Sequence, residues 1–247
     1  MKTKKRIQRP LLLILVLVSG LFFNACNIGN GRMIRGDGNV ITASHEVTAF
    51  KNIDIQGMFE VVLQPNEGQP LTLETDENLH ELINIRVKNN TLHVSTTKEG
   101  IYRPTKMILT IPYSQLENIT IGGACKLTSD FPVITHSLAF RISGAADIDL
   151  ELEVSSLNTN VSGAANINLE GTANSHVASL SGASNMRAEK LHTQNTKISL
   201  SGAGSAHVHA SDHLDASISG VGSIRYHGDP KTTKIHRTGI GSIKSAG

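Results

Sequence analysis

The sequence predicts an all-β protein, a parallel β-solenoid whose coils are about 19 residues long. A seven-residue phrase, first seen as ISGAADI at residues 142–148, occurs six times in the C-terminal half. Apolar and polar residues alternate with the period of two that is typical of strands, and no proline lies between residues 133 and 229. Repeats of this length without helical periodicity favour a solenoid built from strands.

Residues 1–25 have the features of a signal peptide. Five basic residues lie within the first nine positions, and the apolar run LLLILVLVSGLFF follows at residues 11–23. The run is short for a membrane span, and a basic start before a short apolar segment is typical of secreted proteins.

Cys26 ends the sequence FNAC, which resembles the cleavage box of bacterial lipoproteins. We expect its thiol to be acylated and to anchor the protein, because each buried methylene of an acyl chain contributes about 0.8 kcal/mol. Asn27 is not the aspartate that favours retention in the inner membrane, so the outer membrane is expected. Residues 26–40 would then form a lipidated tether. The alternative is an ordinary signal peptide followed by a chance cysteine.

Loss of residues 1–25 changes the charge of the protein. The whole chain has 23 basic and 21 acidic residues, a net charge of +2. Without the five basic residues of the leader, 18 basic residues stand against 21 acidic ones, and the net charge becomes −3. This balance lacks the basic excess of nucleic-acid binding proteins, so we expect no nucleic-acid partner.

Residues 41–121 are expected to form a more irregular N-terminal β part of the solenoid. Segments such as FEVVLQ, LTLET and KMILTIP alternate apolar and polar residues. Asn89 and Asn90 lie between two such segments and indicate a hairpin turn. The one helix candidate, at residues 76–83, is short.

Residues 122–247 contain the regular S-G-A repeats. Their central glycines follow one another at intervals of 18 to 21 residues and are Gly123, Gly144, Gly163, Gly182, Gly202, Gly220 and Gly239. We expect these glycines to stack at one corner of successive coils. A narrow interior would leave no room for a side chain there, and glycine tolerates the backbone angles of a bend.

The alternation also assigns an inner and an outer face. From Leu138 to Val154 the even-numbered residues are apolar or small, and most odd-numbered residues are polar. Cys125 falls in a small inward column beside Gly123. Because Cys26 is expected to carry lipid, Cys125 has no disulfide partner, and we expect a buried, inert thiol.

These motifs resemble those of the auto-transporter adhesin family with the head GIN domain. The resemblance rests on GDGNV at residues 36–40, on the F-x-x-I-x-I-x-G pattern of residues 50–57 and on the serial S-G-A repeats. It covers residues 36–244. It implies a right-handed, single-stranded β-helix in a secreted or lipid-anchored bacterial protein, and it implies no known reaction.

One outward column is a candidate cation site. Acidic side chains at the seventh position after successive glycines would stack about 4.8 Å apart and could hold Ca²⁺. They are Asp130, Glu151, Glu170 and Glu189, and His209 and His227 follow in the same column. We prefer the simpler interpretation that unequal coil lengths disperse the column and solvent screens it, so that no cofactor is needed.

Two further clusters contain residue types used in catalysis or metal binding, but each lacks the additional groups that such a site needs. Asp147 and Asp149 point the same way on one strand, as carboxylates of pectin-cleaving β-helix enzymes do. No cluster of Arg, Lys or His supports them in register, and the next copies contain Asn166 and Asn168, then Asn185 and Arg187. His207 and His209, with His227 in the neighbouring coil, could bind zinc, yet no third ligand is clear. We interpret both clusters as solvated surface, and assign no catalytic residue and no metal.

The sequence therefore favours a non-catalytic lipoprotein of the bacterial cell envelope, an adhesin-like module that presents its outer columns to a surface, a glycan or a protein. Two alternatives stay open. One is a polysaccharide-cleaving lyase or hydrolase on the same scaffold. The other is a structural envelope protein that forms homo-oligomers through uncovered β-helix ends. Scarce aromatic residues, at 4% of the chain, weaken any version that stacks sugar rings.

Overall fold

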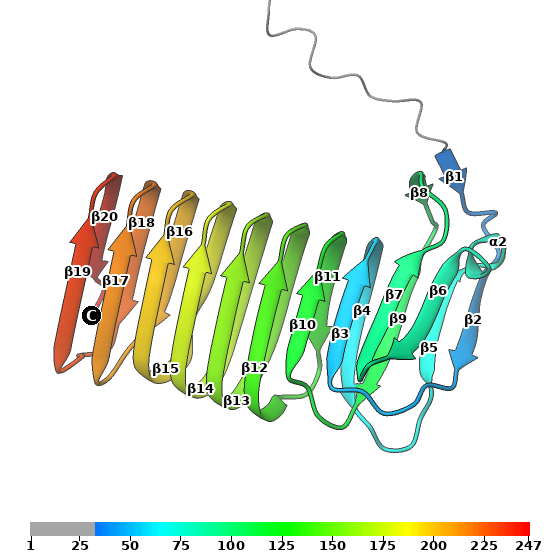
Figure 1. The fold of residues 1–247 in the computed structure, drawn as a ribbon, viewed down its shortest axis with the longest axis horizontal. Coiled ribbons are helices and arrows are strands. Elements are labelled where there is room, and N and C mark those ends of the chain that lie inside the picture. The colour runs from blue at the N-terminus through cyan, green and yellow to red at the C-terminus, as the bar shows by residue number, and fades with distance from the viewer. Residues whose placement is uncertain (1–32) are drawn as a thin grey trace, which may run out of the picture.

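The computed structural model describes residues 33–247, and these residues form the predicted parallel β-solenoid. Successive coils stack side by side along one axis, and a less regular group of strands covers the N-terminal end of the stack (Figure 1). One sheet of 18 strands contains all the coils. The sequence-based fold class is therefore confirmed.

The elements divide into an irregular and a regular part. The irregular part contains β1 (Met33–Arg35), β2 (Val40–His45), β3 (Asn52–Gln56), β4 (Met58–Pro65), β5 (Leu71–Asp76), α2 (Glu77–His80), β6 (Ile83–Lys88), β7 (Thr91–Thr96), β8 (Ile101–Arg103) and β9 (Met107–Tyr113). The regular part contains β10 (Asn118–Ile121), β11 (Ala124–Ser129), β12 (Val133–Ile142), β13 (Ala145–Val161), β14 (Ala164–Leu180), β15 (Ala183–Leu200), β16 (Ala203–His209), β17 (His213–Ile218), β18 (Val221–His227), β19 (Thr232–Arg237) and β20 (Ile240–Ser245).

Each regular coil has two faces that meet at its S-G corner. The first face follows the glycines: it contains β4, β11, the N-terminal halves of β13, β14 and β15, and then β16, β18 and β20. The second face precedes the glycines: it contains β3, β10, β12, the C-terminal halves of β13, β14 and β15, and then β17 and β19. Neighbouring strands on both faces are parallel.

The interior of the solenoid is a continuous apolar core. The even-numbered residues from Leu138 to Val154 are buried, apart from the corner glycine, as the alternation predicts. Ile148, Ile167 and Met186 stack in register on consecutive coils and are each at most 2% exposed. Burial of each such side chain contributes about 1.5–3 kcal/mol, so the repeated column stabilises the whole row.

The seven corner glycines stack as predicted, but for a different physical reason. The amide of Ala164 donates to the carbonyl oxygen of Gly144 (3.0 Å), and the pattern repeats from coil to coil. A Cβ added to Gly163 would overlap the carbonyl oxygen of Gly144, and every glycine of the column meets the glycine of the preceding coil in this way. None of the seven has a positive φ. Close approach of neighbouring backbones, rather than interior space or unusual backbone angles, requires glycine here.

The solenoid includes a coil that the S-G-A repeats do not reveal. β3 and β4 pair in parallel with β10 and β11, so that Ile53 lies beside Ile119 and Phe59 beside Cys125. The amide of Ala124 donates to the carbonyl oxygen of Gly57 (2.8 Å), which makes Gly57 the corner residue of this earlier coil. The partners are 66 residues apart because β5 to β9 lie between β4 and β10 in the sequence. Of these strands, β7 and β9 extend the two faces by pairing in parallel with β3 and β4.

The chain between these coils folds back over the N-terminal end. β2 pairs antiparallel with β5, β5 with β9, and β6 with β7. Asn89 (φ 50°) and Asn90 (φ 60°) form the predicted hairpin turn between β6 and β7. The predicted helix is shorter than residues 76–83, because strand pairing begins again at Ile83. Within residues 33–247 no helix is long and apolar enough to span a membrane.

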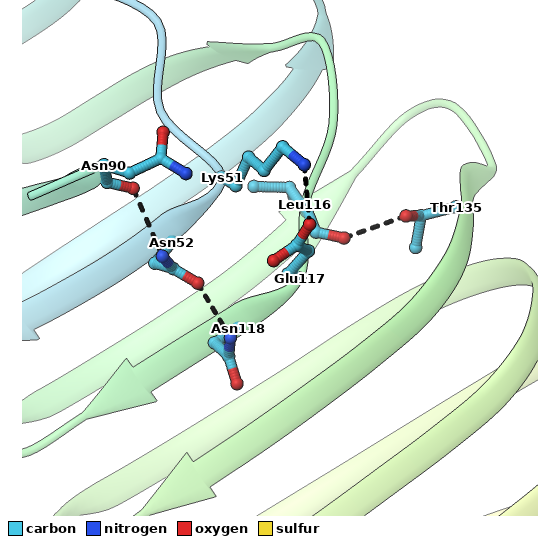
Figure 2. A network of polar contacts seen from close by, with 7 residues as sticks. All are labelled: Lys51, Asn52, Asn90, Leu116, Glu117, Asn118 and Thr135. Atoms are coloured by element: carbon cyan, nitrogen blue, oxygen red, sulfur yellow. Dashed lines mark hydrogen bonds and ion pairs between the residues drawn. The ribbon is translucent and has the colours of Figure 1, made fainter.

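Polar side chains join the returning chain to the coil that it left (Figure 2). The ammonium of Lys51 lies 2.8 Å from the carboxylate of Glu117. The side-chain amide of Asn118 donates to the side-chain oxygen of Asn52 (2.7 Å). The side-chain amide of Asn52 donates in turn to the backbone carbonyl oxygen of Asn90 (3.2 Å). In the next coil, Thr135 donates to the carbonyl oxygen of Leu116 (2.9 Å). These bonds pin the register of β3 and β10 at the start of the two strands.

Candidate binding surface

The first face presents three parallel outward rows where β15, β16, β18 and β20 lie side by side. The corner row contains Ala183, Ala203, Val221 and Ile240. The hydroxyl row contains Ser205, Ser223 and Ser242, and Asn185 occupies the same position on β15. The basic row contains Arg187, His207, Arg225 and Lys244.

These rows exist because the intervening residues are buried. Met186, Ala206, Ile224 and Ile243 lie between the hydroxyl row and the basic row along their strands, and each is at most 6% exposed. Since alternate residues of a strand point to opposite faces, the flanking positions must point outward. Equivalent residues on adjacent strands lie about 4.8 Å apart, so each row is a straight ladder along the axis of the solenoid.

The charges of the basic row are free of carboxylate partners. Within residues 33–247, Arg187, Arg225 and Lys244 are in none of the ion pairs, all seven of which involve other residues. Arg187 and Arg225 are exposed as well. The basic row therefore offers unpaired positive charge to solvent or to a ligand.

A hollow nearer the N-terminal end has a different character. Its volume is about 650 Å³, and the residues that line it include Met58, Met107, Ala145 and Ala164. Both lysines that line it are already paired, Lys126 with Glu60 (2.7 Å) and Lys106 with Glu74 (2.8 Å). Among the described residues no unpaired basic side chain lines this hollow, in contrast to the basic row.

The predicted carboxylate column is not assembled as a cation site. Glu151 and Glu170 are neighbours, but a register shift after Asn168 places Lys190, rather than Glu189, opposite Glu170. The ammonium of Lys190 lies 2.7 Å from the Glu170 carboxylate. Asp130 follows the end of β11 and is exposed. Among the residues that the structure describes, no group of three or more His, Cys, Asp or Glu side chains could hold a metal ion.

The physical reason for this displacement is one extra residue. The interval from Gly182 to Gly202 is 20 residues, one longer than the preceding interval. The β-bulge in β15 absorbs this residue and moves Glu189 out of the column. The longer interval is one of the unequal coil lengths that predicted a dispersed column, and the register shift agrees with that interpretation.

The paired aspartates lie where the alternation places them. Asp147 lies in register between Lys126 and Asn166, and Asp149 between Thr128 and Asn168, so one basic residue does accompany the pair. The side-chain amide of Asn168 donates to the carboxylate of Asp149 (2.8 Å). The basic neighbour, Lys126, is already paired with Glu60 (2.7 Å), and the other neighbours in register are a threonine and two side-chain amides.

The histidine cluster is larger than the sequence indicates. His209 and His227 are neighbours in register, as expected, and His207 stacks on His227 with ring centroids 6.0 Å apart. His192 also approaches His209 edge-on, at 4.9 Å between centroids. Burial lowers the pKa of His209 and the neighbouring His192 and His227 lower it further, against a raising effect of its bond to Thr193. His209 is therefore uncharged at neutral pH.

Of the two cysteines, only Cys125 lies among the described residues. Cys125 is 5% exposed, and burial raises the pKa of its thiol to about 12, so the predicted buried thiol is confirmed and is protonated at neutral pH. Cys26, the predicted lipidation site, lies outside the described residues.

One buried histidine was not predicted from the sequence. His176 occupies the inward column of the second face, in register with Leu157, and is 1% exposed. Its Nε2 lies 3.2 Å from the hydroxyl of Thr159, which is also fully buried. The available signal was its position 19 residues after Leu157, one coil along an apolar column.

Comparison with known proteins identifies the fold. The family model described as "Putative auto-transporter adhesin, head GIN domain" matches residues 49–230. The chain belongs to this family. The head GIN match thus extends from the first coil of the solenoid to the start of the last one. A search of curated proteins found no match.

Solved structures agree with the head GIN assignment. A putative adhesin from Bacteroides fragilis NCTC 9343 is 29% identical, with a TM-score of 0.78, over 86% of this chain and 99% of that chain. A putative lipid binding protein from Parabacteroides distasonis ATCC 8503 is 20% identical, with a TM-score of 0.69, over 87% and 100% of the two chains. A putative adhesin from Parabacteroides merdae ATCC 43184 is 22% identical, with a TM-score of 0.63, over 87% and 99%. The last two likenesses concern the fold alone.

Proposed function

We propose that this head GIN protein is a non-catalytic, lipid-anchored binding module of the bacterial outer membrane. Membership of an adhesin family carries the proposal, and the straight outward rows of the first face supply a surface suited to it. A rigid sheet that repeats the same side-chain types at equal intervals is matched to a repetitive ligand, such as a glycan or a structured cell surface. Asn166 and Asn168 lie beside Asp147 and Asp149, and Lys126, the basic neighbour of Asp147, is already paired with Glu60. This environment favours binding over hydrolysis at this face.

Lipid anchoring through Cys26 is tested by labelling cells with an alkyne-tagged fatty acid. We expect the wild-type protein to carry the label and to sediment with the outer membrane. Cys26→Ala should lose the label, whereas Cys125→Ala is a matched control that should keep it. Labelling that persists in Cys26→Ala would reject the anchor.

Binding and catalysis are separated on a soluble form that starts at residue 27. All buried hydrophobic residues of the described chain lie between Phe50 and Ile243, so this form retains the whole core. A glycan array and an assay for new reducing ends are run in parallel. Binding without cleavage supports the proposal. Cleavage that disappears in Asp147→Asn/Asp149→Asn would support the polysaccharide-cleaving alternative instead.

A further inference from the structure

We propose that the basic row is a binding site for an acidic polysaccharide, whose carboxylate or sulfate groups lie along the solenoid axis. This inference rests on the proposed binding function and names its ligand class. Arg187, His207, Arg225 and Lys244 occupy one outward position on four consecutive coils, and no acidic residue interrupts them.

The spacing of the row suits a linear polymer of charged sugars. Register pairs join Arg187 to His207, His207 to Arg225, and Arg225 to Lys244. With about 4.8 Å between parallel strands, the row extends roughly 14 Å, and its two arginines are about 10 Å apart. A linear acidic glycan repeats its charge every one or two sugar rings, which is the same order of distance. One chain can therefore contact several cationic side chains at once.

The chemistry of the row favours oxyanions. Arginine presents a planar fork of N–H donors that binds carboxylate or sulfate through two parallel hydrogen bonds. Lys126 and Lys190, on the same face, have carboxylate partners at 2.7 Å, but Arg187 and Arg225 have none among the described residues. A ligand would thus gain contacts without displacing an internal ion pair.

The hydroxyl row supplies the neutral part of sugar recognition. Ser205, Ser223 and Ser242 run beside the basic row in matching register. The hydroxyl of Ser205 donates to the side-chain oxygen of Asn185 (3.0 Å), so its own lone pairs remain available. These side chains are short and leave the longer basic ones accessible. Sugar hydroxyls can bond to this row while the acidic groups bind the arginines.

The arrangement favours a polymer over an anionic membrane. The basic row is one residue wide, and Asp147, Asp149 and Glu151 lie on the same face only a few coils away. These carboxylates would repel a flat anionic surface laid on the face, whereas a linear chain can end at Arg187. Ion pairing also replaces the ring stacking that a chain with 4% aromatic residues can hardly provide.

The test measures binding of the soluble form to polygalacturonate, dextran sulfate, neutral dextran and vesicles that contain anionic phospholipid. The test variant is Arg187→Gln/Arg225→Gln. The control variant, Arg86→Gln/Lys88→Gln, removes the same charge from two exposed positions of β6. We expect the wild type to bind both polyanions but not neutral dextran. The affinity should fall about tenfold or more in the test variant, since two of the three Arg and Lys side chains of the row are lost. The control should bind as the wild type does, and added salt should weaken binding.

Three results would overturn the inference. If the wild type binds neither polygalacturonate nor dextran sulfate, the ligand class is rejected. If the test and control variants bind equally well, the basic row is rejected as the binding site. Binding to anionic vesicles without binding to the soluble polyanions would assign the charges to a membrane surface. If neutral glycans bind on the array while polyanions do not, the proposed binding function stands and only the ligand class is wrong.

Discussion

Thr159 Oγ1 and His176 Nε2 lie 3.2 Å apart in the interior of the solenoid, where neither residue is more than 1% exposed. Burial lowers the pKa of His176 from 6.5 to about 4. The unfolded chain therefore binds a proton between these pH values that the folded chain does not. Stability from this site is complete above pH 6.5 and is lost as the pH falls toward 4, by about 3 kcal/mol in total.

Replacement of His176 by leucine should remove this pH dependence. Leu157 and Leu214 occupy the same inward column, so a leucine fits the position. The loss of the hydrogen bond to Thr159 costs about 1 kcal/mol at every pH. The informative quantity is therefore the difference in unfolding free energy between about pH 7.5 and pH 4.5, on either side of the unfolded pKa, measured with urea. His136→Leu changes an exposed histidine and should keep the wild-type difference. Equal pH dependence in wild type and His176→Leu would contradict the assignment.

Gly163→Ala should destabilise the protein by about 2 kcal/mol or more, because its Cβ would overlap the carbonyl oxygen of Gly144. Thermal unfolding followed by circular dichroism measures the effect. Ala164→Ser is the matched control: the residue is exposed and adjacent, so the change should stay within about 0.5 kcal/mol. Similar melting temperatures for the two variants would show that the corner tolerates a side chain.

Millimolar calcium should leave the melting temperature of the wild type unchanged, because the ammonium of Lys190 already neutralises Glu170. Lys190→Glu should place a third carboxylate in register with Glu151 and Glu170, destabilise the protein through like-charge repulsion, and make its stability respond to calcium. Lys190→Gln removes the ion pair without adding a carboxylate and should not respond. A calcium-dependent shift in the wild type would restore the cation site.

Arg237→Leu should cause association through the C-terminal end of the solenoid. Arg237 is in register with Ile218 and stands in the column that is apolar in the preceding coils. Within the described chain β19 pairs with β17 on one side only, and all six of its residues are exposed. A charge at an inward position of an edge strand opposes pairing with a second copy. Size-exclusion chromatography over a range of concentrations should show a monomer for wild type and Arg237→Lys, and a larger species for Arg237→Leu. A monomeric Arg237→Leu would contradict this role.

Much of the fold was predictable because its signals are local. The alternation of Leu138, Phe140 and Ile142 with polar neighbours depends only on strand geometry, and it assigned the buried side correctly. The glycine intervals placed Gly144 beside Gly163, since a parallel coil must return to the same position after a constant number of residues. The coil of β3 and β4 was not predictable in this way, because its partner strands are 66 residues away.

The candidate binding surface was harder to predict, because it depends on neighbours across strands. Arg187, His207 and Arg225 are 20 and 18 residues apart, and neither interval equals the average repeat. The bulge in β15 decides that Lys190, and not Glu189, faces Glu170. A shift of one residue reverses which side chains meet, although it leaves the general pattern of alternation in place.

By itself, the sequence determined the winding of the chain, the stack of glycines and the division between core and surface, because these follow from strand alternation and from glycine intervals of 18 to 21 residues. Only the tertiary structure decided which outward side chains become neighbours, that His176 meets Thr159, and that Gly57 begins the glycine stack. These relationships depend on hydrogen-bond register between distant strands, and register is set by bulges and by the length of the chain that leaves and rejoins the coil.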